Sequence, residues 1–447
     1  WNSRPAWDVD IANLNLTEGG ISFISHNLGK KMNVPKEVTR LGGIHYVGHL
    51  SGRGDRLSSK GRLETGAGNA DIQLSKNGKN IQAKIATKGI ALDRILANKT
   101  FGQVATTIEV KGNKDHLVAK GEISRFDYNK YSFRNIRLDG QYNHGIVKGL
   151  ASIDDPNIRV DIEGNYAMKG NKYAINTHID HLQPSILGVK MADKGYSLDD
   201  IDLSANNQSS DSYLDLEAPF MSLHARGQYN LSTLVSSIQN MIAEKLPTLP
   251  GIKKTKAKGD NDFTLQGNIY STEVLNKILG IPLAISSPIH INGNISEQSN
   301  ELNLYLSAPL FSYNGKPFHN GNVELTTLDN ALSLEARITQ GMPYEKAPEI
   351  KLKAAAADNV LSTLLNYNNH SSKLPLSGLL NADTRFSKNE QGQLTIQTSV
   401  KPSSLMLGDT QWDVKASTVE YHKNHLTVDN FVVKHDKQHV IINGMAT

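Results

Sequence analysis

Hydrophobic and polar residues alternate with a period of two along most of the chain. The segments ELNLYLS (301–307), ALSLEARI (331–338) and IHINGNI (289–295) place apolar residues mostly at alternate positions. Such alternation predicts β-strands with one apolar and one polar face. Asn-Gly sequences such as 77–78 and 314–315 separate these segments and favour tight hairpins. Parallel strands would need many crossover helices, so we predict a long antiparallel meander.

Short amphipathic segments that predict helices recur along the chain. They cover residues 34–41, 90–97, 182–187, 272–279 and 358–365. The last four are about 90 residues apart, and a fixed interval of this kind is typical of a repeat array. A longer amphipathic segment, 231–246, stands outside this cycle. It is followed by a stretch rich in Lys and Gly, 248–262, which we interpret as a loop or linker.

The interval between the predicted helices divides the chain into five predicted β-groove units. They cover residues 1–89 with the short helix near 34–41, 90–181, 182–271 with the inserted helix 231–246 and the linker 248–262, 272–357, and 358–447. The last unit stops inside a strand-like alternation, so we expect it to be truncated at its C-terminus. The chain also begins at Trp1 without an initiator Met, and we expect it to be a piece of a longer protein.

A short helix in each unit is too small to cover the apolar face of a sheet, because eight helical residues span only about 12 Å. A second sheet, closure into a barrel, or curling around a ligand could each bury that face. We favour curling. The predicted fold class is therefore mainly β, an elongated antiparallel meander curled into a groove with one short helix per repeat.

Composition and charge exclude several classes of protein. Lys and Arg total 48 against 44 for Asp and Glu, and there is no basic block, which argues against a nucleic-acid partner. The absence of Cys excludes disulfides, thiol nucleophiles and thiolate metal sites. No stretch has the 18 or so uninterrupted apolar residues that span a bilayer.

Candidate catalytic and metal-binding groups are sparse. His178, Asp180 and His181 have the residue types of a metal site, but a solvated turn is the favoured interpretation. The segment LDDIDL (198–203) lacks the Gly and the distal Glu of a calcium loop. The aromatic residues of the 128–142 hairpin could stack on a sugar, although cross-strand aromatic pairs also stabilise hairpins. We therefore predict no enzymatic activity, no cofactor and no metal.

Two stretches supply the aliphatic residues that we predict to line the groove. In the first they are Leu117, Ile123, Ile136, Leu138, Ile153, Val160 and Ile162. In the second they are Ile289, Ile291, Ile295, Leu302, Leu304 and Leu306. Such a wall suits phospholipid acyl chains, because shielding one long chain from water is worth roughly 10 kcal/mol at about 0.8 kcal/mol per CH₂.

Segments 34–52 (VPKEVTRLGGIHYVGHLSG) and 128–165 (YNKYSFRNIRLDGQYNHGIVKGLASIDDPNIRVDIEGN) resemble repeats of the TamB family, in the AsmA-like group, in its Bacteroides-type version. The closing FVVKHDKQHVIINGMAT has the same form of strand, polar hairpin and strand. As a pattern, the resemblance covers nearly the whole chain. It is that of a central fragment, since neither the family's N-terminal anchor nor its C-terminal domain is recognisable.

The resemblance implies a translocation and assembly module of the bacterial cell envelope. Such proteins are anchored in the inner membrane of a Gram-negative bacterium and cross the periplasm as a β-structured groove. They engage an outer-membrane partner of the Omp85 type through a C-terminal domain. They serve phospholipid transport, protein secretion and outer-membrane biogenesis. Here the resemblance implies a scaffold without enzymatic activity, whose anchor and partner-binding domain are missing from the chain.

A second hypothesis is a secreted or surface string of β-sandwich modules that bind glycan or host protein. It predicts lipid-free protein, whereas the groove predicts co-purified phospholipid. A glycan-processing enzyme would need two carboxylates about 5 to 10 Å apart in one cleft, and no local spacing marks such a pair.

Overall fold

The computed structural model describes residues 6–17, 19–20, 36–208, 212–256, 259–343, 346–388 and 392–446. The chain is mainly β, with 66% of its residues in strands and 9% in helices, and the described residues contain 29 strands. The strand pairs are antiparallel, so the predicted antiparallel β class is confirmed. Contacts divide the chain into two compact units, unit 1 (Trp1–Gln208) and unit 2 (Ser209–Thr447).

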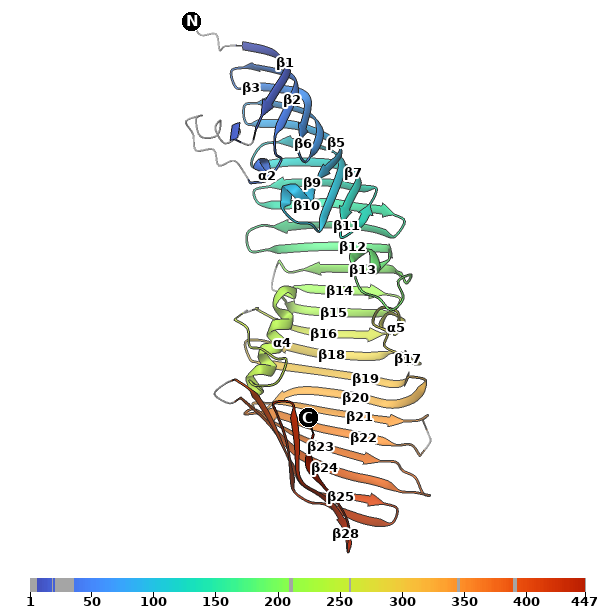
Figure 1. The fold of residues 1–447 in the computed structure, drawn as a ribbon. Helices are drawn as coiled ribbons and strands as arrows, with labels where there is room; N and C mark the ends of the chain where they lie inside the picture. Colours follow the sequence, from blue (N-terminus) through green and yellow to red (C-terminus); the bar gives the residue numbers. More distant parts are fainter. Residues whose placement is uncertain are drawn as a thin grey trace. The chain divides into compact units, whose positions relative to one another are not determined.

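Unit 1 is a meander in which each strand pairs with the next along the chain, except that β7 pairs both with the short strand β8 and with β9 (Figure 1). Its strands are β1 (Ala6–Leu16), β2 (Ile44–Arg53), β3 (Arg56–Thr65), β4 (Gly68–Asn77), β5 (Asn80–Ala91), β6 (Phe101–Gly112), β7 (His116–Tyr128), β8 (Tyr131–Phe133), β9 (Ile136–Asn143), β10 (Ile146–Asp155), β11 (Ile158–Ala167), β12 (Lys172–Leu182) and β13 (Leu198–Asn206). Alternation at period two gives these strands one apolar and one polar face.

Unit 2 is a second meander, with two short strands, β17 and β26, at its margins. Its strands are β14 (Tyr213–Ala218), β15 (Met221–Gln228), β16 (Asp262–Ile269), β17 (Leu283–Ile285), β18 (Ile289–Ser296), β19 (Glu301–Tyr313), β20 (Lys316–Leu328), β21 (Ala331–Gln340), β22 (Glu349–Ala357), β23 (Val360–Asn368), β24 (Leu376–Lys388), β25 (Leu394–Leu407), β26 (Thr410–Val414), β27 (Ser417–His422), β28 (His425–His435) and β29 (Gln438–Ala446).

In the described part of the chain, the helices are short, with one exception, α4 (Leu231–Lys245). The others are α2 (Lys36–Thr39), α3 (Leu92–Leu96), the 3-10 helix η1 (Pro184–Leu187) and α5 (Glu273–Leu279). Residues 34–35 of the first predicted helix lie outside the described residues. The predicted helices at 231–246 and 272–279 are confirmed. A helix also lies within each of the predicted segments 90–97 and 182–187, but residues 90–91 belong to β5, Leu182 belongs to β12, and η1 is a 3-10 helix of four residues. Between Lys245 and Asp262, no helix or strand is assigned in the described residues, as expected for a linker.

The predicted helix at 358–365 is wrong, because these residues form a hairpin turn and the start of strand β23. Asp358 and Asn359 have φ angles of 50° and 63°, the left-handed values that a two-residue turn requires and that these two residue types tolerate. Pairing of β23 with both β22 and β24 then outweighs the helical pattern. The succession of helices at intervals of about 90 residues therefore stops at α5.

Buried core is concentrated where helices and loops pack on the sheet. In unit 1, Ile186 of η1 packs with Phe133, Ile136, Ile158 and Val160. In unit 2, a smaller cluster joins Leu246, Ala356 and Phe386, just beyond the C-terminal end of α4. These short elements anchor local patches of the apolar face.

The turn at Asn359 provides a test of this packing. Its side chain accepts hydrogen bonds from the Thr248 amide and hydroxyl, and it donates to the Phe386 carbonyl. Asn359→Ala should lower the free energy of unfolding of unit 2 by about 2 to 4 kcal/mol, through backbone strain and lost hydrogen bonds. Asn359→Gly, which tolerates the φ angle, should cost about 1 kcal/mol less. Urea unfolding of the full chain measures both, and equal losses for the two variants would contradict the assigned strain.

Candidate functional site

The candidate residues of unit 1 lie on one apolar face. Ile123 is the direct cross-strand partner of Ile136, Ile136 of Ile153, and Ile153 of Val160. Direct partners in antiparallel strands share a face, so these four residues form one row across β7, β9, β10 and β11. The row continues through Ile179 of β12 to Ile201 of β13.

The remaining candidates of unit 1 lie in neighbouring rows of the same face. Leu138 stands between Gly121 and Ala151, and Ala151 also pairs with Ile162. Leu117 lies opposite Tyr142, further along the strands. The sheet thus brings together residues that are up to 45 positions apart in sequence, since 162 minus 117 is 45.

Unit 2 repeats this arrangement with its own candidates. Ile291 is paired with Leu306, and Ile295 with Leu302. Leu304 lies opposite Gly293 and Leu325, and Ile289 lies opposite Ile269. All six candidates of this stretch therefore occupy one face of β18 and β19.

The rows extend beyond the residues that the sequence analysis selected. In unit 1, Ile85 pairs with Ile108 on β5 and β6, and Ile108 pairs with Gly121. In unit 2, the row that contains Leu306 continues through Val323, Ala336, Leu352, Leu365 and Leu380. The same alternation marks these residues in the sequence, but only the register between strands shows that they are neighbours.

The apolar face is only partly covered. Ile136, Val160, Ile289 and Leu302 are buried, whereas Leu138 is 38% exposed and the other candidates are half-buried. Leu365 and Leu380, in the extended row of unit 2, are 38% and 36% exposed. The core of a β-sandwich would bury such central positions between two sheets. Apolar side chains in the middle of these rows are therefore left available to a ligand.

Paired glycines keep part of this face shallow. Gly48 and Gly61 are direct partners on β2 and β3, and the Tyr46 ring lies across them. A Cβ atom at Gly61 would be 2.7 Å from the Tyr46 ring. The Tyr46 hydroxyl reaches 2.9 Å from the Ser59 hydroxyl, so the ring lies flat against the sheet. An aromatic ring that covers glycine in this way stabilises a strand pair while adding little height to the face.

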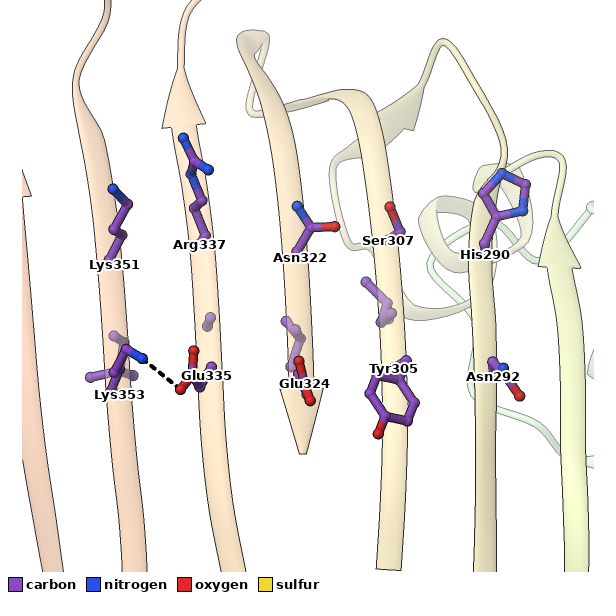
Figure 2. Close-up of a pocket in the computed structure, with 14 residues that line it drawn as sticks. His290, Asn292, Tyr305, Ser307, Asn322, Glu324, Glu335, Arg337, Lys351 and Lys353 are labelled. Atoms are coloured by element: carbon purple, nitrogen blue, oxygen red, sulfur yellow. Dashed lines mark hydrogen bonds and ion pairs between the residues drawn. The ribbon is translucent and has the colours of Figure 1, made fainter. Parts of the chain in front are cut away.

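The opposite face carries ion pairs between adjacent strands. Lys120 lies 2.7 Å from Asp139 in unit 1, and Lys353 lies 2.7 Å from Glu335 in unit 2, where Figure 2 shows the pair. Each pair joins direct cross-strand partners. Such pairs penalise a one-residue slip, which would move every apolar side chain to the wet face.

The residues considered as a metal site form separate ion pairs on strand β12. His178 Nδ1 lies 2.8 Å from Asp202 Oδ1, His181 Nδ1 lies 2.6 Å from Asp199 Oδ1, and Asp180 pairs with Arg159. The predicted solvated turn is therefore wrong, because strand pairing extends to Leu182. Among the described residues, no group of three or more His, Asp or Glu side chains is placed to hold a metal ion.

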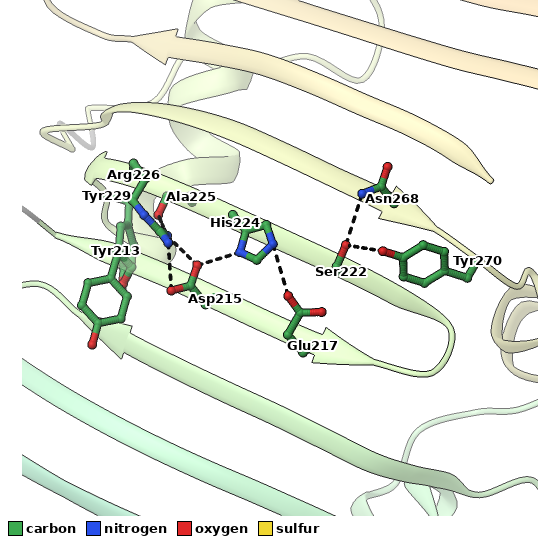
Figure 3. Close-up of polar contacts among 10 residues, drawn as sticks. All are labelled: Tyr213, Asp215, Glu217, Ser222, His224, Ala225, Arg226, Tyr229, Asn268 and Tyr270. Carbon is green, nitrogen blue, oxygen red and sulfur yellow. Dashed lines mark hydrogen bonds and ion pairs between the residues drawn. The ribbon is translucent and has the colours of Figure 1, made fainter.

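A charged network on β14 and β15 has the residue types of a catalytic group (Figure 3). Asp215 accepts hydrogen bonds from His224 and from both terminal nitrogens of Arg226, and the other ring nitrogen of His224 lies 3.2 Å from Glu217. Burial raises the pKa of Asp215, but the hydrogen bonds from Arg226 and His224 outweigh it and keep that pKa below its ordinary value. Both imidazole nitrogens face carboxylates, so the network is suited to holding β14 and β15 in register.

The aromatic hairpin packs as core. Phe133 is buried, and its ring centroid lies 4.8 Å from that of Tyr131 in an edge-to-face arrangement. Tyr131 donates a hydrogen bond to the buried Asp155, which also accepts from the Arg134 amide. Tyr142 lies at the far end of β9, opposite Leu117 and Val147. These contacts favour hairpin stabilisation over a sugar-stacking platform.

No family model matches the chain, and no curated protein or solved structure shows detectable similarity to it. In the described part of the chain, no helix combines the length and the apolar character that crossing a bilayer requires. The apolar rows and their partial exposure are therefore the features of the structure that bear on function.

The polar-face pairs generate a prediction about pH. The hydrogen bond to Asp202 raises the pKa of His178, against a smaller opposing effect of desolvation, and the nearby Asp200 and Asp180 add to the increase. Protonation of His178 therefore stabilises the fold at pH values below the ordinary histidine pKa, and this contribution is lost as pH rises through the elevated pKa. NMR titration of His178 should give a pKa above the ordinary value, and Asp202→Asn should lower it. An unchanged pKa in that variant would contradict the assigned cause.

Proposed function

We propose that this chain is a scaffold without enzymatic activity that carries phospholipid acyl chains along its apolar face, between the inner and outer membranes of a Gram-negative bacterium. The observation that carries the proposal is the continuity of partly exposed apolar rows from strand to strand. In this proposal the sheet curls around the lipid as a groove and its polar face remains in water. The resemblance to TamB repeats supports the same function.

The dimensions of the rows suit transport better than a single binding site. Strands are about 4.8 Å apart, and a row in unit 1 crosses at most twelve strands, because β8 and β9 both pair with β7, so it covers roughly 53 Å. An acyl chain of one leaflet is about 15 Å long, half of the hydrocarbon core. An acyl chain could thus move along a row while its CH₂ groups stay shielded from water, which is worth about 0.8 kcal/mol for each group. Uniform aliphatic contacts, as in the row of Leu306, Val323 and Leu352, also leave little to hold an acyl chain at one position.

The wider cellular role is proposed from the resemblance. In that role, the parent protein is anchored in the inner membrane, crosses the periplasm and engages an Omp85-type partner, and it supports outer-membrane protein assembly. Those contacts would involve segments of the family other than the repeats that this chain resembles. The part assigned to this chain is the conduit between them.

The exposure of the central apolar residues favours this proposal over a string of β-sandwich modules. Leu138 is 38% exposed, although both of its cross-strand partners, Gly121 and Ala151, belong to the apolar face. A ligand that covers this row would remove that surface from water, and no catalytic group is needed for such a role.

Purified protein should retain lipid. We expect an organic extract of the chain, expressed in a Gram-negative host and purified without detergent, to contain phospholipid that mass spectrometry detects at one or more molecules per chain. The physical reason is the partly exposed apolar face, which water disfavours. Lipid-free protein with an unchanged circular dichroism spectrum would contradict the proposal.

A pair of matched variants tests which face holds the lipid. Leu138→Asp places a charge in the apolar row and should reduce the retained phospholipid at least about tenfold, because an unpaired carboxylate opposes contact with hydrocarbon. Leu150 provides the control: it is 55% exposed on the neighbouring strand β10 and lies on the opposite face, between Asp139 and Glu163. Leu150→Asp should leave the lipid content unchanged. Equal losses in the two variants, with both folded, would count against the assignment of the face.

A further inference from the structure

A trough crosses the polar face of unit 2 over five strands, β18 to β22 (Figure 2). Its volume is about 430 Å³, within the range of ligand sites. Two ladders of side chains form its walls, and each strand contributes one residue to each ladder. One ladder runs from His290 to Lys351 and the other from Asn292 to Lys353, in direct cross-strand register.

The cationic side chains at one end of the trough are already neutralised. Lys353 lies 2.7 Å from Glu335, and Lys351 lies 2.7 Å from Glu349, which also pairs with Arg337. The pKa of Glu349 stays below its ordinary value because hydrogen bonds from Lys351 and Arg337 outweigh the effect of burial. A polyanion would have to compete with these internal carboxylates for the same three cations.

Glu324 differs from these internally paired charged residues. It lies directly opposite Glu335 on β20 and β21, and like charges in that position destabilise a strand pair. Lys353 pairs with Glu335, whereas Glu324 is exposed and makes no ion pair or hydrogen bond with the described residues. A local destabilisation that no other contact compensates is typical of a binding site. An unpaired carboxylate in this position can accept hydrogen bonds from a ligand.

An aromatic ring stands beside this carboxylate. Tyr305 is 44% exposed, and its direct cross-strand partners are Glu324 on one side and Asn292 on the other. Figure 2 shows the three side chains on the same face, in one ladder. Ser307 and Asn322 stand across the trough from them and add a hydroxyl and an amide. Ring, carboxylate, amides and hydroxyl together offer stacking, donors and acceptors with little net charge.

We infer that this trough binds a neutral oligosaccharide. Sugar hydroxyls can donate to the Glu324 carboxylate and both donate to and accept from the amides, while the C–H face of a sugar ring can pack on Tyr305. The internal ion pairs of the three cations disfavour a polyanion. Five strands at about 4.8 Å give a trough roughly 19 Å long, which suits several linked sugars.

This inference concerns the face opposite to the proposed lipid rows and does not depend on them. Leu306, Val323, Ala336 and Leu352 line the trough between the two ladders, but the alternation along each strand assigns their side chains to the apolar row. The same strands would therefore contact lipid on one side and glycan on the other. A failure of glycan binding would leave the lipid proposal untouched, and the reverse also holds.

Calorimetric titration of the full chain with chitotetraose, cellotetraose and maltotetraose tests the inference. We expect at least one of these neutral tetrasaccharides to bind with a stoichiometry of one. Tyr305→Ala should weaken that binding at least about tenfold by removing the stacking surface. Glu324→Gln, which keeps the shape but loses the charged acceptor, should weaken it several-fold.

Tyr313 supplies the matched control. It is on the same strand, β19, is 46% exposed, and lies outside the trough, so Tyr313→Ala should bind the sugar as the parent chain does. The inference is overturned if none of the three sugars binds to the chain, or if the two tyrosine variants lose affinity equally. Preferential binding of heparin, lost as salt is raised and reduced by Tyr305→Ala, would identify a polyanion site and overturn it as well.

Discussion

An extended apolar sheet face has to be removed from water, and the described residues of this protein cover theirs only in part. Buried clusters form where η1 and the end of α4 pack on the sheet. Between such places, residues such as Leu138 and Leu365 stay more than a third exposed. Hydrophobic burial is the main favourable term in folding, and the partly covered rows are therefore the basis of the proposed contact with lipid.

The polar face makes this arrangement possible by fixing the register. Pairs such as Lys120 with Asp139 and His178 with Asp202 join strands on the wet side, and each would be broken by a shift of one residue. Exposed pairs contribute little individually to stability. Their value here is specificity, because a single slip would exchange the apolar and polar faces of a strand. The same face also has room for a second, polar ligand beside Tyr305.

The sequence was sufficient for the class of fold and for the side on which each candidate residue lies, because alternation at period two carries that information directly. It failed at residues 358–365, where Val360, Leu361 and Leu364 fit a helical stripe and only the left-handed turn at Asn359 and pairing with distant strands decide the outcome. Partners across strands, such as Glu324 and Glu335, could not be predicted either, since register depends on every turn in between. The trough therefore became visible only in the structure.

The most direct test of the central claim is photo-cross-linking along one strand in living cells. A photoreactive amino acid would replace Asp161, Ile162 and Glu163 of β11 in turn, and lipid adducts would be measured by mass spectrometry. Ile162 faces Ala151 and Thr177 on the apolar side, whereas its two neighbours face the polar side. The account predicts lipid adducts at position 162 and not at 161 or 163. Equal adducts at the three positions, or none at 162, would contradict it.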